Sequence, residues 1–319
     1  MSGALRTQFV GLDFRNPLVL ASGTAGYGQE LARVMDLGAV GGLVTKAVSV
    51  EPRRGAAAPR VGEFGGGMIN AIGLANPGVD AVVREALPWL ATQRDLRVLV
   101  NVVGNSIDDF VTVVERVSDQ RGVDGVELNV SCPNVKAGIE FGADRGLLAD
   151  LVRAVRAATS RPIVVKLSPA SADLVGSAQA AVDAGADALT LVNTMPGLVI
   201  DVAHRRPRLG FGTGGVSGRA LLPIGVLATW RVRRAVSVPI IGLGGVASAD
   251  DALQYLLAGA TLVGMGTAAM ADPKRPARIA RALASWCARA GVASLDAIRG
   301  TAEWPATANP AFAPIRSLV

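Results

Sequence analysis

Eight short apolar runs, rich in Val, Ile and Leu, recur along the chain and alternate over most of its length with longer amphipathic stretches. Continuous apolar runs of this kind are typical of parallel strands buried on both faces. The stretches between them have the spacing of helices that bury one side. The runs that predict strands are 17–21, 42–45, 97–103, 125–130, 162–167, 188–192, 238–243 and 261–265. The stretches that predict helices are 108–118, 147–158, 171–184, 219–236 and 249–258.

This alternation predicts an α/β protein, and eight strands favour a closed (β/α)8 TIM barrel over an open doubly wound sheet. Glycines at the ends of two predicted helices, in 183–187 and 257–261, support the pattern because glycine readily ends a helix before a strand. No low-complexity tract or charged linker divides the chain, so we expect a single domain over residues 1–319. The stretch 48–96, between the second and third strands, is too long for one crossover. We expect it to be an insertion that folds over the active face.

The composition indicates a soluble globular protein, with 50% hydrophobic and 18% charged residues. The net charge of +6 raises nucleic-acid binding as an alternative, but no aromatic residues interleave with the basic clusters, so we do not expect it. Two cysteines in 319 residues argue against a disulfide framework and indicate the reducing cytoplasm. Glycines break the most apolar stretch, 256–271, and no signal-peptide core occurs in 1–10, so we expect no membrane segment.

A polar side chain or a glycine pair follows each predicted strand. Because the carboxyl ends of all barrel strands meet on one face, where the chemistry of such barrels occurs, we expect these residues to share a site. Taken singly, each could cap a turn or face solvent. In strand order they are Ser22 with Gly23, Lys46, Asn101, Asn129, Lys166, Asn193 with Thr194, Gly244 with Gly245, and Gly266 with Thr267.

These residue types indicate a planar cofactor that carries a phosphate. Asparagine amides offer paired donors and acceptors that suit a flat heteroaromatic ring or a cyclic imide. Lys46 and Lys166 could stabilise electron density on a carbonyl or ring nitrogen. The glycines after the last two strands lie where this fold usually binds phosphate. FMN fits this set, whereas no cluster of metal ligands and no early G-x-G-x-x-G for a dinucleotide is present.

Cys132 is the best candidate for acid–base chemistry, since the only other cysteine is Cys287 and the only histidine is His204. It follows the strand 125–130 in the sequence Asn-Val-Ser-Cys-Pro-Asn-Val-Lys, 129–136. A thiol at a strand's carboxyl end can transfer a proton if its pKa is drawn toward neutrality. The alternative, a buried structural thiol, is common for free cysteines, but the polar strand ends favour the chemical role.

Several strings in one order resemble the dihydroorotate dehydrogenase family, over about residues 11–273. They include Asn-Pro-Leu-Val-Leu-Ala-Ser-Gly at 16–23, Asn-Ala-Ile-Gly-Leu-Ala-Asn-Pro-Gly at 70–78, Asn-Val-Ser-Cys-Pro-Asn-Val-Lys at 129–136 and Ile-Gly-Leu-Gly-Gly-Val at 241–246. The resemblance implies a flavin barrel that oxidises dihydroorotate to orotate in UMP biosynthesis. It implies that Cys132 takes a proton from ring carbon 5 while hydride leaves carbon 6 for the flavin.

The resemblance also implies the binding residues, with Lys46 shared between cofactor, substrate and catalysis. FMN would be held by Ser22, Lys46, Ala47, Asn101, Asn129, Lys166, Val192, Gly218, Gly244, Gly245, Gly266 and Thr267. Dihydroorotate would contact Lys46, Asn70, Ala71, Ile72, Gly73, Leu74, Asn129, Asn193 and Thr194. We expect no metal.

A cysteine base and a first strand near residue 17 resemble the soluble class rather than the membrane-bound, serine-base class. The sequences at 135–142 and 200–201 resemble the NAD-linked type, which implies a partner subunit with FAD and a [2Fe–2S] cluster, in a homodimer or a heterotetramer. Two cysteines are too few for this chain to hold such a cluster. Alternatives are a fumarate-linked enzyme, a dihydropyrimidine dehydrogenase-like domain, which typically has histidine where Asn134 stands, and a tRNA-dihydrouridine synthase.

Overall fold

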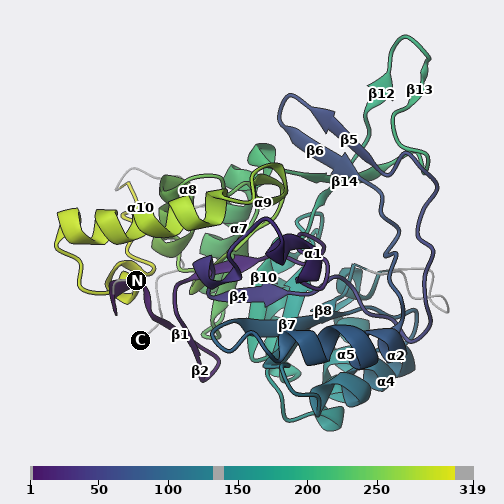
Figure 1. Ribbon diagram of the computed structural model, residues 1–319, viewed down its shortest axis with the longest axis horizontal. Helices are drawn as coiled ribbons and strands as arrows, with labels where there is room; N and C mark the ends of the chain where they lie inside the picture. Colours follow the sequence, from purple (N-terminus) through teal and green to yellow (C-terminus); the bar gives the residue numbers. More distant parts are fainter. Residues whose placement is uncertain (1–2, 132–139, 306–319) are drawn as a thin grey trace.

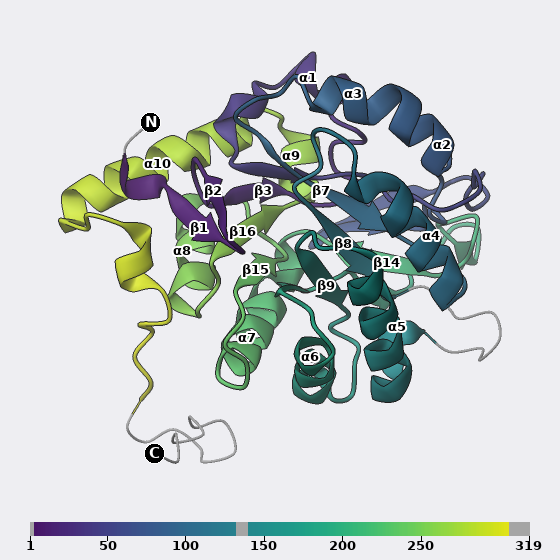
Figure 2. The same ribbon diagram turned by 90° about the horizontal axis from the view of Figure 1, so that it is seen from below.

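A closed barrel of eight parallel strands forms the centre of the molecule in the computed structural model, which describes residues 3–131 and 140–305 (Figure 2). The strands follow one another around the barrel in chain order, and each lies within its predicted apolar run. The predicted (β/α)8 barrel is therefore confirmed. Its strands are β3 (Leu18–Leu20), β4 (Gly42–Val44), β7 (Arg97–Val102), β8 (Gly125–Asn129), β9 (Ile163–Leu167), β10 (Ala188–Leu191), β15 (Ile240–Leu243) and β16 (Leu262–Met265).

Helices surround the barrel, and all five that the amphipathic pattern predicts are present (Figure 2). Four of them begin at a serine or aspartate, Ser106, Asp144, Asp173 or Ser248, whose side chain accepts a hydrogen bond from a backbone N–H of the first turn. The longer helices are α4 (Ile107–Ser118), α5 (Arg145–Ala158), α6 (Leu174–Asp183), α7 (Leu222–Arg233), α8 (Ala249–Leu257) and α10 (Arg275–Ala290).

Shorter helical segments lie between these elements. The π-helical segment η3 (Val82–Ala86) joins α2 (Val79–Ala81) to α3 (Leu87–Leu90) within the long insertion. The remaining short segments are α1 (Gln29–Ala32), α9 (Thr267–Ala271), η1 (Gly3–Leu5), η2 (Leu37–Ala39), η4 (Phe141–Ala143), η5 (Arg219–Leu221) and η6 (Leu295–Ile298).

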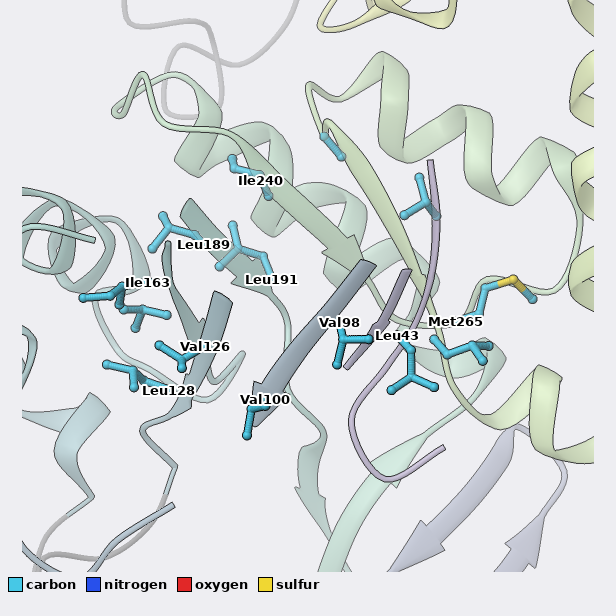
Figure 3. Packing of buried hydrophobic residues seen from close by; sticks show 14 of the residues in the cluster. Leu43, Val98, Val100, Val126, Leu128, Ile163, Leu189, Leu191, Ile240 and Met265 are labelled. Atoms are coloured by element: carbon cyan, nitrogen blue, oxygen red, sulfur yellow. The ribbon is translucent and has the colours of Figure 1, made fainter. Parts of the chain in front are cut away.

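Alternate strand residues bury against two different cores, because successive side chains of a strand point to opposite faces. One core packs between strands and helices; Figure 3 shows part of it, with Val98, Val126, Leu128 and Ile163 among its members. The second core lies inside the barrel. Its strand residues are Val19, Val44, Leu99, Val164, Ala188, Ile241 and Leu262.

A short antiparallel hairpin that the sequence did not predict, β1 (Thr7–Phe9) with β2 (Leu12–Phe14), precedes the barrel. Phe9 and Phe14 pack edge to face, with ring centroids 5.8 Å apart, and belong to the core inside the barrel. Phe14 also contacts Gly42, the first residue of β4. The hairpin therefore closes the amino-terminal end of the barrel, opposite the expected site.

The long insertion forms a hairpin, β5 (Val61–Phe64) with β6 (Gly67–Asn70), that rises above the barrel (Figure 1). It pairs with a second excursion, which follows β10 in the chain, to give a four-stranded antiparallel sheet in the order β11-β14-β6-β5. The strands of this second excursion are β11 (Met195–Gly197), β12 (Ile200–Asp201), β13 (Arg206–Pro207) and β14 (Gly214–Ser217).

In the described ranges, no helix is both long and apolar enough to span a bilayer. The single domain over residues 1–319 stays a prediction.

Candidate functional site

A cavity of about 910 Å³ lies where the carboxyl ends of the barrel strands meet the antiparallel sheet. Sites for small molecules typically enclose roughly 300–1,000 Å³, so it can hold a cofactor together with a substrate. The insertion supplies part of the wall, which confirms that it lies over the active face. All nineteen residues that the resemblance assigns to FMN or dihydroorotate line it: Ser22, Lys46, Ala47, Asn70, Ala71, Ile72, Gly73, Leu74, Asn101, Asn129, Lys166, Val192, Asn193, Thr194, Gly218, Gly244, Gly245, Gly266 and Thr267.

Cys132, the predicted proton-transferring group, lies outside the described residues. Ser131 and Glu140, the described residues on either side of segment 132–139, both line the cavity.

Hydrogen bonds from neighbouring segments hold the backbone around Lys46, just after β4. Lys46 N–H donates to the Gly26 carbonyl at 2.8 Å, and the Tyr27 hydroxyl donates to the Ala47 carbonyl at 3.0 Å. Burial, with a smaller contribution from the Glu30 carboxylate, raises the pKa of Tyr27 above its usual value, so the phenol keeps the proton it donates. This brings a primary amine to the cavity wall at a fixed backbone position.

Lys166 projects from β9 toward the barrel interior and is 5% exposed. Its Nζ donates to Ser22 Oγ at 3.1 Å, which links the strand ends of β9 and β3. A lysine ammonium has three donors, so two remain for a ligand. The contact brings together two residues that the sequence predicted to bind the same cofactor.

The ends of β8 and β10 are joined by a hydrogen bond between the side-chain amides of Asn129 and Asn193. Asn193 Nδ2 donates to Asn129 Oδ1 at 3.2 Å and to Ser131 Oγ at 3.1 Å. Asn193 Oδ1 accepts from the backbone N–H of Thr194 at 2.9 Å. These contacts fix the orientation of the Asn193 amide.

Asn70, at the end of β6, reaches the same cavity from above. Its Nδ2 donates to the carbonyl of Gly215 on β14 at 3.2 Å. Gly215 packs so closely on Thr194 that a Cβ there would lie 2.2 Å from the Thr194 hydroxyl. The predicted substrate residues from the insertion and from β10 thus share one wall.

Glycines form the end of the cavity that follows β15 and β16. Gly244 and Gly245 have φ of +131° and +76°, and a Cβ at Gly245 would lie 2.6 Å from the backbone nitrogen of Leu222. Tyr255, fully buried, donates to the Gly244 carbonyl at 2.8 Å. Next to them, Thr267 Oγ1 donates to Ser217 Oγ at 2.9 Å. Backbone without side chains can approach a phosphate closely at such an end.

Asn101, on β7, has one buried hydrogen-bond acceptor without a donor among the described residues. Its Nδ2 donates to Glu127 Oε1 at 2.7 Å, while no described group donates to its buried Oδ1. A buried polar atom is normally satisfied. This open acceptor, the lysines and the glycine end fit a planar ring with an N–H and a phosphate tail.

Comparison with known proteins identifies the family. The family described as "Dihydroorotate dehydrogenase" matches residues 4–286. The chain belongs to the dihydroorotate dehydrogenase family. It is 45% identical over 294 residues, 92% of this chain and 96% of the relative, to a protein of Geobacter sp. (strain M21). It is also 45% identical over 300 residues to one of Geobacter sulfurreducens, with 94% and 98% covered. Both are named dihydroorotate dehydrogenase B (NAD(+)), catalytic subunit.

Membership of the dihydroorotate dehydrogenase family confirms the resemblance seen in the sequence and the prediction of an oxidoreductase. The family generally uses a flavin. Among the described residues, no group of three or more His, Cys, Asp or Glu side chains could hold a metal ion.

The sequence missed two arginines of this dihydroorotate dehydrogenase-family cavity, Arg219 and Arg275. Arg219 directly follows Gly218 and pairs with Asp251 at 2.9 Å. Arg275 opens α10 and lies near the glycine end through contact with Ala247. Neither follows a barrel strand directly, so the strand-end pattern could not find them, and the family resemblance did not assign them.

Proposed function

We propose that this chain is the catalytic subunit of an NAD(+)-linked dihydroorotate dehydrogenase, which oxidises dihydroorotate to orotate in UMP biosynthesis. The observation that carries the proposal is the joint lining of one cavity by the strand-end lysines, asparagines and glycines. The names of relatives 45% identical to this chain support the same assignment.

FMN is the flavin that we propose for the cavity. The glycine end would take its phosphate, and Ser22, Lys46, Ala47, Asn101, Asn129, Lys166, Val192 and Gly218 would surround the rest. Bound FMN would supply the acceptor for the hydride that leaves carbon 6 of dihydroorotate. Lys166, with two donors left, would stabilise negative charge on the ring.

Dihydroorotate would be held by amide and backbone groups on the opposite wall. Asn129, Asn193 and Thr194 offer donors and acceptors that match the imide edge of the substrate. The segment 70–74 with Lys46 would bind its carboxylate. Lys46 would also stabilise negative charge that develops on the substrate as carbon 5 loses its proton.

Cys132 is the group that we propose to take this proton. A thiol whose pKa lies near neutrality is partly ionised at neutral pH, and its thiolate can accept a proton. The chain's single histidine, His204, is exposed on the β12–β13 turn and hydrogen-bonded to Asp201. Ser131, next to Cys132, bonds to Asn193 on the substrate wall.

A partner subunit would carry the electrons onward to NAD(+). We propose FAD and a [2Fe–2S] cluster on that partner, since two cysteines in this chain cannot ligate a cluster. The catalytic chains would form a homodimer within a heterotetramer in the cytoplasm.

The test is to purify the full chain, alone and with its electron-transfer partner, and to identify the flavin released on heating. We expect stoichiometric FMN, bleaching by dihydroorotate, and NAD(+) reduction only with the partner. Robust turnover with fumarate by the isolated chain would refute the NAD(+)-linked assignment. Bleaching by dihydrouracil but not by dihydroorotate would favour the dihydropyrimidine dehydrogenase-like alternative.

A further inference from the structure

Arg275 is a basic residue on the wall of the cavity that neither the strand-end pattern nor the family resemblance assigns to the site. It is the first residue of α10, and it lines the cavity together with Gly244, Gly245, Gly266 and Thr267. Its side chain is 36% exposed. It is therefore partly screened from solvent and still within reach of a ligand at the glycine end.

The contacts of Arg275 leave much of its hydrogen-bonding capacity open. Nη1 donates to the carbonyl of Ala247 at 3.3 Å, and Nη2 lies 3.6 Å from Asp272 Oδ2, a carboxylate that also contacts Arg278. Nε is buried and has no acceptor among the described residues. A guanidinium has five N–H donors in a planar fork that matches the oxygens of a phosphate.

Arg219, the other arginine of this cavity, is more fully neutralised. Its Nη1 lies 2.9 Å from Asp251 Oδ2, and the Asp251 side chain is only 5% exposed. The same Asp251 oxygen accepts from the backbone N–H of Ala247 at 3.0 Å. Asp251 thus holds both Arg219 and the loop that Arg275 touches, while Arg275 has the less compensated charge.

We propose that Arg275 binds the phosphate of the flavin and makes the site select a phosphorylated flavin over riboflavin. This inference rests on the proposed function, in which the phosphate of FMN lies at the glycine end. Backbone N–H groups alone recognise the shape of a phosphate, whereas a guanidinium adds charge-assisted hydrogen bonds to its oxygens. Riboflavin has the same ring and ribityl chain without the phosphate, so it is the matched probe.

The experiment measures the dissociation constants of FMN and riboflavin with flavin-free protein, by fluorescence quenching. For Arg275→Gln we expect FMN to bind about tenfold more weakly, as for loss of a charge-assisted hydrogen bond, while riboflavin binding stays within about twofold. Arg275→Lys keeps the charge without the fork, and we expect an intermediate loss. The control is Arg281→Gln, on the same helix and with the same change of charge, outside the cavity wall.

An unchanged ratio of FMN to riboflavin affinity in Arg275→Gln would overturn the inference, and so would an equal loss in Arg281→Gln, which would indicate bulk charge alone. If both flavins weaken equally in Arg275→Gln, the residue supports the fold and does not select phosphate, which also overturns it. Absence of any flavin binding by the unaltered chain would instead refute the proposed function. In that case neither riboflavin nor FMN would bind to the unaltered chain, whereas loss of the Arg275 contact alone affects only the variant.

Discussion

Asn101 donates a hydrogen bond to Glu127 at 2.7 Å inside the barrel, from β7 to the neighbouring strand β8. Glu127 is 1% exposed, and its other oxygen accepts from the Thr190 hydroxyl, also at 2.7 Å. A buried carboxylate is costly unless its oxygens are satisfied. Here the Asn101 amide on the cavity wall and the Thr190 hydroxyl on β10 satisfy both carboxylate oxygens. The carboxylate therefore fixes the orientation of the Asn101 amide.

We expect Glu127→Ala to destabilise the protein by about 3–5 kcal/mol, because it leaves a cavity and two buried donors without acceptors. Glu127→Gln should cost about 1 kcal/mol or less. Its carbonyl can accept from Asn101, and the Thr190 hydroxyl can turn to accept from its amide. Urea unfolding, with the same dependence of the free energy of unfolding on urea concentration in all proteins, measures the loss of stability in both variants. If Gln is as destabilising as Ala, the negative charge itself is needed and hydrogen bonding alone does not explain this site.

Lys166 offers a test of the cofactor wall. Lys166→Met keeps the length of the buried chain but removes the ammonium, and we expect FMN binding to weaken by about tenfold or more. Ser22→Ala removes the hydroxyl that Nζ contacts while the charge stays, so a smaller loss is expected. Flavin titration of the two variants measures the difference. Equal losses would mean that Lys166 acts only by holding Ser22.

Cys132→Ser tests the proposed proton acceptor. We expect the variant to keep FMN and to bind orotate, but to lose most turnover at neutral pH, because a serine hydroxyl is a far weaker acid than a thiol. Activity should recover in part as the pH rises. Stopped-flow bleaching of the flavin by dihydroorotate measures the step directly, and full activity at neutral pH would remove Cys132 from the mechanism.

Cys287→Ala is the matched control for that experiment. Cys287 is 2% exposed on the inner side of α10, and burial raises the pKa of its thiol. A thiol held protonated within the core has no role in the reaction, so we expect unchanged rates and a loss of about 1 kcal/mol in stability. Slowed flavin reduction in this variant would show that cysteine replacement disturbs the site indirectly.

The barrel could be predicted because its strands are buried on both faces and are therefore apolar along most of their length, even β3 and β4 with three residues each. The strand-end residues of the site followed from the barrel, since parallel strands deliver their ends to one face. A local pattern thus predicted both the fold and the part of the cavity wall that the strand ends form.

Other parts depend on contacts between distant segments, which no local pattern reveals. Residues 61–70 and 195–217 are rich in glycine and lack a clear apolar period, yet they pair through β6 and β14 above the cavity. Glu127 interrupts an apolar run within a strand, and only the alternation of the folded strand directs it into the barrel. Arg275 lies on a surface helix, so its place at the glycine end depends on how α10 packs.

Gly245→Ala tests whether the glycine end must be free of side chains. The residue has φ of +76°, and a Cβ would lie 2.6 Å from Leu222 N and 2.8 Å from its Cα. Gly291→Ala is the control, because Gly291 has a similar φ of +65° but nothing within 4 Å of the added carbon. Both variants carry the cost of an alanine in the left-handed region, about 1–2 kcal/mol.

Only Gly245→Ala should also force apart the loop after β15 and the start of α7, so it should lose flavin at temperatures where the Gly291 variant retains it. Thermal melting of the two variants, followed by both flavin fluorescence and circular dichroism, separates strain from steric clash. Equal melting temperatures and equal flavin retention would show that the close approach at Gly245 is not required to bind the cofactor.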